Sequence, residues 1–505
     1  MNLFKKLRLP VFLPPFFLLI ISLILSLTNR AQFLEKANQI NSFIIENFGF
    51  LFELEAFLLV VTCIVILMSP IGSLRIGGKN AQPLLTKWRW FSIVLCTTIA
   101  TGILFWGTAE PVFHLINPTN SLSIDPLSKE AGIFSLSTLY LHWSFTPYAI
   151  YTVPALLFAI AFYNQKKTFS LHSTLFPFRL SGRIPYLAEI IDAICLFALV
   201  AGMAASLGGG ILILSGGVDY FRGIDSGNFT LLLIAILIVT SFVVSASTGL
   251  MKGIRFLSDI NLRIFILLLL FVFFTSSIGY LLLSFSDAIW LYITQFLNKS
   301  TFMMQHPDDP WAGDWTVFYW ANWMAWAPIT SLFLGRVSYG YTVREFMITN
   351  WVLPSLFAIL WMSIFGGSTL DMYFNQEINL PKILEENGPE SIIYQLFSTL
   401  PFQDVLVIVF LLTAFISYVT AADSNTEAMS GISATGITPE SASPPIFIKI
   451  IWGVTIGITA LVMVSYAGID GIRILSNIGG LPSLILIIFI NIAMFKFIIS
   501  FRNRK

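Results

Sequence analysis

Residues 314–336, DWTVFYWANWMAWAPITSLFLGR, are long and apolar enough to cross a bilayer as a helix, yet they hold four tryptophans. A hydrocarbon core of ~30 Å needs about 20 helical residues. At ~100° per residue, Trp320, Trp323 and Trp326 spread over about 120°, and Trp315 falls close to Trp326. The four rings therefore share less than half of the circumference. The stretch predicts a transmembrane helix with one aromatic face.

The rest of the chain is equally apolar. Of its 505 residues, 56% are hydrophobic and 11% are charged, with a mean hydropathy of +0.82; soluble globular chains carry about 25% charged residues. Backbone polar groups in a bilayer need internal partners, so the long apolar runs are helices, and they lack the alternation of barrel strands. We predict an all-α integral membrane protein with twelve transmembrane helices, near residues 10–28, 48–70, 90–112, 136–162, 185–215, 228–248, 262–285, 315–335, 350–371, 403–424, 447–467 and 474–500.

Charges and cysteines exclude several function classes. A net charge of +1 is incompatible with a nucleic-acid-binding surface, which needs a concentrated basic face. Cys63, Cys96 and Cys195 lie in separate apolar runs, so we expect no disulfide, and the four histidines are scattered, so we expect none to bind a metal ion. With a cytoplasmic N-terminus, about three quarters of the Lys and Arg residues fall on the inner side. This bias predicts that both termini are cytoplasmic.

The position of the four tryptophans along the helix suggests what they face. An interfacial aromatic belt accounts for Trp315 and, at most, Trp320. Trp323 and Trp326 lie about 12 and 17 Å further along the helix axis than Trp315. Pro328 removes a backbone donor and disrupts the helix around it, and broken helices at membrane depth are tolerated where they line a cavity. We predict that the inner rings lie beside a cavity halfway through the bilayer, with ordinary helix packing as the alternative.

A second aromatic face occurs in residues 138–153, TLYLHWSFTPYAIYTV. This span also carries a proline, Pro147, and four of its rings lie within about 140° on a helical wheel: Tyr140, Trp143, Tyr148 and Tyr151. A box of rings with few hydrogen-bond donors suits a quaternary ammonium group, which binds ring faces at ~0.5–2 kcal/mol per contact. Packing without a ligand remains the alternative at this point.

A third irregular element is residues 97–113, TTIATGILFWGTAEPVF, in which Gly102 and Gly107 loosen the helix and Glu110–Pro111 is expected to end it. Interrupted helices at corresponding positions of two halves mark the binding site of inverted-repeat transporters. The third and eighth spans stand five apart, as two five-helix repeats would require.

These residues resemble the betaine/carnitine/choline transporter family. The stretch DWTVFYWANW resembles the family signature and departs from it at Asn322, where the family has tryptophan. Further similar segments occur in the same order along the chain: FWGTAEP (105–111), LHWSFTPYAIY (141–151), GRVSYGYTVREF (335–346), SIFGGS (363–368) and VTAADS (419–424).

The resemblance implies a LeuT-like core of two inverted five-helix repeats, usually assembled as a homotrimer in the plasma membrane. In this interpretation the chain is one transporter domain, 1–505, whose parts are two N-terminal helices (1–89), a first repeat (90–285), an external surface helix and loop (286–313) and a second repeat (314–500). The segment SDAIWLYITQFLN (286–298) has the apolar spacing of a helix that lies on the membrane surface.

The resemblance also implies the substrate-binding residues. The family's aromatic box maps onto Trp143, Tyr148, Tyr151 and Trp323, and Trp326 corresponds to a further ring along the permeation path. Tyr148 stands where tryptophan is usual; a phenol still offers a ring face, with a weaker interaction than indole. The implied substrate is a trimethylammonium-type solute such as glycine betaine, choline or carnitine.

Ion-coupling positions depart from the sodium-coupled members of the family. The third helix reads Thr98 to Gly102, TIATG, with Ala100 at its centre and fewer glycines than the family pattern. In the tenth helix Thr420 is followed by Ala421, so one hydroxyl of a Thr–Ser pair is missing, and Met203 takes the place of a threonine in the fifth. A thioether is a poor ligand for a hard cation. We expect weak or absent sodium coupling and no other cofactor.

Two acidic residues, Glu110 and Asp423, lie near span ends at motif positions. Carboxyl groups inside a membrane suggest function. We expect a capping or gating role for both, with proton carriage as the alternative.

The sequence therefore predicts a secondary transporter of quaternary ammonium compounds that works by alternating access and has lipid and a small solute as partners. A sodium-coupled symporter of the same solutes is the first alternative. A channel would need charged rings or filter carbonyls, and an enzyme would need a catalytic constellation such as HExxH or GxSxG; neither pattern occurs in the spans.

Overall fold

The computed structural model describes residues 6–99, 102–178, 185–222, 227–247, 252–437 and 444–502. Within these ranges the chain forms helices joined by short connections, and its extended pairing is limited to two isolated bridges, Leu7 with Ala434 and Arg75 with Thr342. The predicted all-α class is confirmed.

The helices of the first half follow the predicted spans, with several breaks. They are α1 (Leu9–Thr28), α2 (Arg30–Met68), α3 (Lys87–Ile99), α4 (Gly102–Ile116), α5 (Lys129–Trp143), α6 (Phe145–Ala159), α7 (Leu187–Arg222), α8 (Asn228–Ser247), α9 (Lys252–Thr275), α10 (Ile278–Thr294), α11 (Phe296–Ser300) and α12 (Phe302–Gln305).

The second half contains α13, in which 18 of the 20 residues are buried. Its helices are α13 (Phe318–Val337), α14 (Val343–Met347), α15 (Leu353–Trp361), α16 (Gly367–Gln376), α17 (Leu380–Asn387), α18 (Ser391–Ser398), α19 (Gln403–Ser433) and α20 (Ile446–Arg502).

Ten helices of the described chain are long and apolar enough to cross a membrane, and the bent pair of α3 and α4, inclined by 53°, makes an eleventh. Two of the ten lie in α20, Ile446–Ala467 and Asp470–Arg502. The predicted span near 315–335 is also a helix, α13, although its tryptophans and polar residues make it less apolar. The chain is thus a multi-pass membrane protein, and the count of twelve spans stays a prediction.

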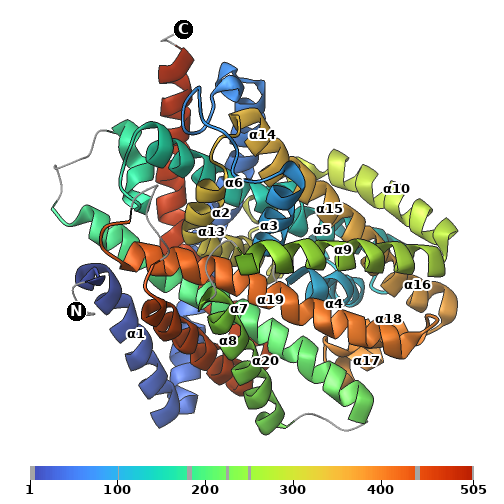
Figure 1. The fold of residues 1–505 in the computed structure, drawn as a ribbon. Helices are drawn as coiled ribbons and strands as arrows, with labels where there is room; N and C mark the ends of the chain where they lie inside the picture. The colour runs from blue at the N-terminus through green and yellow to red at the C-terminus, as the bar shows by residue number, and fades with distance from the viewer. Residues whose placement is uncertain are drawn as a thin grey trace.

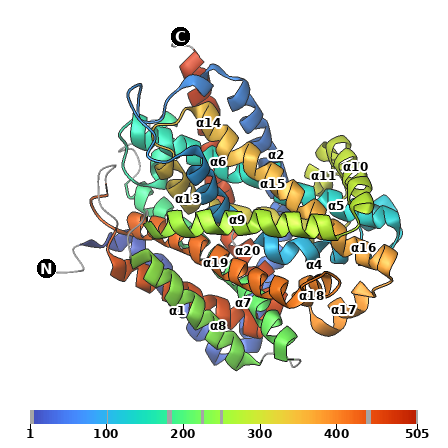
Figure 2. The ribbon, with the colours of Figure 1, turned by 45° about the vertical axis from the view of Figure 1, so that its right-hand side comes forward.

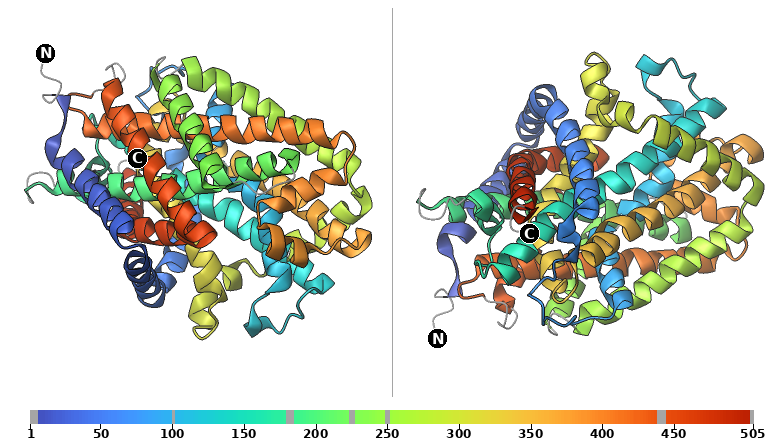
Figure 3. Two further views of the ribbon diagram at one scale, coloured as in Figure 1. Left: turned by 90° about the horizontal axis from the view of Figure 1, so that it is seen from below. Right: turned by 90° about the horizontal axis from the view of Figure 1, so that it is seen from above.

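The centre of the bundle is formed by α5, α6 and α13, with α20 packed along α7 and α13. In the segment Lys129–Asn164, 94% of the residues in the most apolar stretch are buried, whereas the corresponding share in α1 is 28%. Figure 1 shows α13 near the middle of the bundle, beside α6 and to the left of α3. Figure 3 shows the blue N-terminal helix at the edge of the molecule from below and from above. The aromatic face of residues 314–336 therefore lies inside the protein.

Prolines act differently from what the sequence predicts. Pro111 does not end its helix, and α4 continues to Ile116. Proline has no N–H, so the carbonyl of Gly107 lacks its helical donor. That carbonyl lies against Gly366, which has no side chain. Pro328 does not break α13, which runs unbroken to Val337, because one missing hydrogen bond is outweighed by packing on all sides.

Irregular backbone occurs elsewhere instead. The helix of residues 129–164 breaks at Ser144, before Pro147. Four segments of the described chain are π-helical, a form that is frequent at functional sites: Ile160–Asn164, Gly313–Val317, Ile348–Val352 and Met362–Gly366.

The predicted surface helix is α10, which lies far from α1 across the molecule (Figure 2). It begins at Ile278 rather than near residue 286, because α9 already ends at Thr275. Trp290, Leu283 and Ile293 are 69%, 68% and 64% exposed. The helix therefore presents an uncovered apolar face.

Candidate functional site

An aromatic cluster gathers around Trp323 of α13. The centroid of its ring lies 5.4 Å from that of Trp143 with an interplanar angle of 77°, 5.4 Å from Tyr151 at 74°, and 6.1 Å from Tyr148 at 52°. None of the four side chains is more than 4% exposed. Two rings stand nearly perpendicular to Trp323, as adjacent walls of a box do. The structure thus brings together four of the five predicted substrate-binding residues, which we call the aromatic box.

The helix break at Ser144 positions these rings. Trp143 is the last residue of α5, and the φ and ψ of Ser144, −113° and −117°, are not helical. Tyr148 and Tyr151 follow on α6 with a spacing of three, which places them on one face. Because α13 packs along α6, Trp323 meets that face.

The indole N–H groups of the box residues are bonded to the protein. Trp143 donates its indole N–H to Oε2 of Glu110 at 2.8 Å, and Trp323 donates its own to the carbonyl of His142 at 3.2 Å. The hydroxyl of Tyr148 lies in hydrogen-bonding reach of Thr98. With both indole donors occupied, the box offers a ligand its ring faces, which suit a methylated cation.

The aromatic box is closed in this structure, since its rings contact one another and are shielded from solvent. Cavities of 340 and 580 Å³ lie elsewhere, beside Glu390 and beside Trp290. The rings would have to separate to admit a solute. A cavity of solute size among them therefore stays a prediction.

Trp326, the fifth predicted residue, lies apart from the box. Its ring packs on α7, where a side chain in place of Gly202 would come within 2.7 Å of Cδ1. No ring contact joins Trp326 to the four box residues in the described chain. Its expected place along the permeation path stays a prediction.

The two outer tryptophans do not form an interfacial belt. Trp315 and Trp320 are 7% and 0% exposed, and their rings lie 4.6 Å from His114 and 5.7 Å from His142 respectively. The belt interpretation is wrong for both, because hydropathy does not distinguish a ring that faces lipid from one that faces protein.

Behind the box, Glu110 accepts four hydrogen bonds and is fully buried. Its Oε1 lies 2.7 Å from Nδ1 of His142 and 3.2 Å from Nε2 of His114; its Oε2 accepts from Trp143 and from the hydroxyl of Tyr319. We call these residues the Glu110 network. The expected capping role of Glu110 is wrong, because α4 continues past it. A metal ion would have to displace these hydrogen bonds.

The sequence predicted no functional role for His114, His142 or Tyr319. Three helices, α4, α5 and α13, bring them to one carboxylate, and no local pattern reveals that meeting. The nearest signal was the spacing of Glu110 and His114, four residues apart, which places both on one helix face.

The predicted ion-coupling positions lie along the contact of α3 and α19 and on α7. The hydroxyl of Thr98 donates to the carbonyl of Val94 at 2.9 Å, and that of Thr420 donates to Ile416 at 2.9 Å. Thr97 and Ser424, their neighbours in these helices, join α3 to α19 through a hydroxyl pair at 3.1 Å.

The other ion-coupling positions offer side chains without hard ligands. Met203 is fully buried in α7, and its backbone carbonyl accepts from Tyr418 of α19 at 3.1 Å. Ala421 contributes only its carbonyl, which accepts from the amide of Asn425. Ala100 lies outside the described residues.

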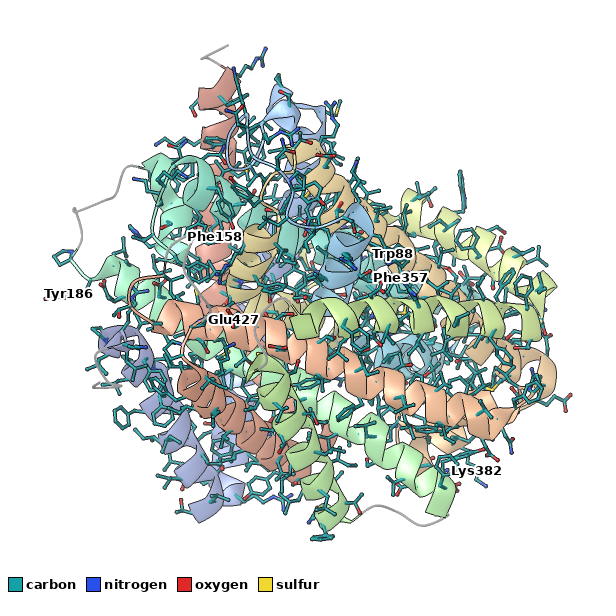
Figure 4. The ribbon with its side chains drawn as sticks, in the orientation of Figure 1. Trp88, Phe158, Tyr186, Phe357, Lys382 and Glu427 are labelled. Carbon is teal, nitrogen blue, oxygen red and sulfur yellow. The ribbon has the colours of Figure 1, made fainter. Side chains whose placement is uncertain are left out.

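Asp423 lies one turn before a buried ionic cluster on α19. Its carboxylate accepts from Ser245 at 2.7 Å. Glu427 pairs with Lys449 at 2.5 Å and with Arg336 at 3.8 Å, and the side chains of Glu427 and Lys449 are both 2% exposed. Figure 4 places Glu427 on α19 near the centre of the view. The predicted gating role of Asp423 stays a prediction.

The helices and the buried aromatic box define a multi-pass, all-α membrane protein with an interior cluster of ring faces. Residues 10–502 match the profile of the BCCT, betaine/carnitine/choline family transporter. The chain therefore belongs to the betaine/carnitine/choline transporter family, and it is a transporter rather than an enzyme.

Individual relatives are similar over nearly their whole length. The glycine betaine transporter OpuD of Bacillus subtilis (strain 168) is 31% identical over 90% of this chain and 87% of its own. The ectoine/hydroxyectoine transporter of Virgibacillus pantothenticus is 27% identical over 95% of this chain and 94% of its own. A solved sodium-coupled sialic acid symporter aligns with a TM-score of 0.49 and 13% identity over 89% of this chain and 86% of that one.

Proposed function

We propose that the protein carries a methylated ammonium solute, such as glycine betaine, choline or carnitine, through the aromatic box by alternating access. The observation that supports this most directly is the geometry around Trp323: three rings contact it, and its indole N–H is bonded to His142. Ring faces whose indole donors are occupied favour a cation that cannot donate a hydrogen bond.

The relatives support this class of substrate. Two of them, as named, carry glycine betaine and ectoine, and others carry choline and proline as well. A channel is disfavoured, because the rings of the box contact one another and are buried.

Transport is proposed to depend weakly or not at all on sodium. Ala421 has no side-chain oxygen, and the thioether of Met203 does not suit a hard cation. The hydroxyls of Thr97 and Ser424 bond to each other and join α3 to α19. The competing proposal is a sodium-coupled symporter of the same solutes, in which other oxygens replace the missing ones.

The remaining assignments follow from family and charge. We place the protein in the plasma membrane with both termini cytoplasmic, with repeats at 90–285 and 314–500 that follow the N-terminal helices of 1–89. Assembly as a homotrimer is proposed, and the uncovered apolar face of α10 is consistent with a neighbour or with lipid.

Thermal-shift measurements on the purified protein test the proposal. Choline, glycine betaine, carnitine and ectoine are added in sodium or potassium chloride, and at least one methylated ammonium compound should raise the midpoint equally in both salts. At a fixed, non-saturating concentration of ligand, Trp323→Leu should reduce the shift, and Trp361→Leu, a buried tryptophan outside the box, should retain it. Absence of any shift in wild type would refute the substrate class.

A further inference from the structure

The Glu110 network holds titratable groups that the aromatic box does not use. Oε2 of Glu110 is occupied by two fixed donors, from Trp143 and Tyr319. Oε1 faces two imidazole nitrogens, those of His114 and His142. A carboxylate with four donors is stabilised in its ionised form. The number of protons in the network is then set by the two histidines.

His142 can hold one or two protons without moving. Its Nδ1 donates to Glu110, and its Nε2 lies 3.1 Å from the hydroxyl oxygen of Thr316. A threonine hydroxyl both donates and accepts. It can therefore donate to Nε2 of a neutral imidazole or accept from Nε2–H of an imidazolium. Both protonation states satisfy the same pair of heavy atoms.

His114 does not have this freedom. Its Nε2 faces Glu110, but its Nδ1 is buried and has no hydrogen-bond partner. A second proton on this ring would place an unpaired donor and a charge in an apolar environment, which is costly. The exchangeable proton therefore belongs on Nε2 of His142.

The network is joined to the aromatic box by direct bonds. Trp143, a wall of the box, follows His142 in the chain and donates to Glu110, and Trp323 donates to the carbonyl of His142. A cation against these rings is thus separated from Glu110 by one indole. With neutral histidines the network carries one negative charge, which attracts the cation; with His142 charged, the network is neutral.

Other charged groups face the network from two further helices. Lys299 of α11 is bonded to Thr138 and lies 4.2 Å from the ring centroid of Phe134. Arg473 of α20 lies 4.5 Å from the ring centroid of Trp315. A positive charge on either side chain would oppose a second proton on His142.

We propose that Glu110, His114 and His142 form a proton-binding site whose exchangeable proton, on Nε2 of His142, is released when a cationic solute enters the aromatic box. The proposal rests on the proposed function, because it needs a cation at the box. The step is an exchange: one proton leaves the imidazolium for bulk water, and one solute cation takes its place beside the carboxylate.

Isothermal titration with choline in two buffers of different ionisation enthalpy, phosphate and Tris, measures this release. The apparent binding heat should differ between the two buffers. The difference equals the number of protons released multiplied by the difference between the two ionisation enthalpies. The dissociation constant of choline should fall as the pH is raised from about 4 to about 8. Binding with a buffer-independent heat and no pH dependence would overturn the proposal.

His142→Asn keeps an amide donor near the position of Nδ1 but cannot titrate. Choline should still bind to this variant, with the buffer difference and the pH dependence lost. The matched control is His172→Asn, a half-buried histidine outside the network, which should release protons as wild type does. Release that persists in His142→Asn would overturn the assignment.

A second measurement separates the proton site from the proposed function. If choline and the other methylated ammonium compounds give no heat in any buffer, the proposed function fails. The histidine signals of ¹⁵N-labelled protein still report on the network: an Nε2 signal, assigned through its loss in His142→Asn, should titrate when the pH is varied between about 4 and 8. A signal that stays unchanged over this range would refute the proton site by itself.

Discussion

The rings of Tyr151 and Trp323 meet edge to face, with centroids 5.4 Å apart and planes at 74°. One belongs to α6 and the other to α13, so any displacement of these helices against each other opens or closes the aromatic box. Trp323 is tied at its indole N–H to the carbonyl of His142, directly before the break at Ser144. The pair therefore joins the aromatic box to the helix break at Ser144.

Replacement of Trp323 should separate ring contact from volume. Trp323→Phe keeps an aromatic face and should weaken choline binding less than Trp323→Leu does. Trp323→Leu removes the face and should weaken it by about 2- to 30-fold, the equivalent of a cation–π contact of ~0.5–2 kcal/mol. Equal affinities of the two variants, measured by titration calorimetry, would show that the ring only fills space.

Sodium should have little effect on uptake. In proteoliposomes, the initial rate of choline or betaine uptake should change by less than about twofold when sodium replaces potassium outside, since Ala421 and Met203 lack hard side-chain ligands. Ala421→Ser adds a hydroxyl at the empty position and provides the comparison. A steep rise of the wild-type rate with sodium would mean that other oxygens complete an ion site.

Removal of Lys449 should destabilise the protein strongly. Lys449→Met leaves the carboxylate of Glu427 buried with only the more distant Arg336, and breaking a buried pair costs about 3–5 kcal/mol. The double variant Lys449→Met/Glu427→Gln should recover most of this loss in thermal unfolding. Lys382→Met, which breaks an exposed pair with Glu386, should leave the unfolding midpoint unchanged; a similar drop there would contradict the argument.

Asp309, in the loop before α13, should stabilise the protein in a pH-dependent way. Burial alone would raise its pKa, but hydrogen bonds from Thr119, Trp311 and Ser121 outweigh burial and lower the pKa. A lowered pKa means that the stabilisation is present above the ordinary value near 4 and is lost as the pH falls through the lowered value.

Asp309→Asn should therefore lower the free energy of unfolding by about 1–3 kcal/mol at neutral pH, and the difference from wild type should shrink in strong acid. Unfolding curves over this pH range check the result. The exposed neighbour offers a control, since Asp308→Asn should unfold as wild type does at every pH.

The helical class and most of the aromatic box could be predicted because both depend on local periodicity. Tyr148 and Tyr151 share a face by their spacing alone, and long apolar runs have few alternatives to a helix in lipid. The resemblance to the family indicated that these rings meet Trp323. Periodicity within one helix could not indicate this, because Trp323 lies on another helix.

The Glu110 network and the pair of Glu427 with Lys449 could not be predicted in the same way. Each depends on which helices pack together, and a charged residue looks the same in sequence whether its partner lies in lipid headgroups or in a facing helix. The burial of Trp315 and Trp320 was missed for a related reason, since neighbours beyond the helix determine whether an aromatic face meets lipid or protein.

The π-helical turn at Met362–Gly366 lets its helix absorb a change of chain length at one place. Such a turn accommodates one residue more than an α-helical turn, so deletion of a single residue there can restore an α-helical turn and keep the residues beyond it in register. A deletion in the regular helix on either side has no such turn to absorb it and would rotate everything beyond it by about 100°. Deletions in these flanking helices should therefore be tolerated less well than one within the turn.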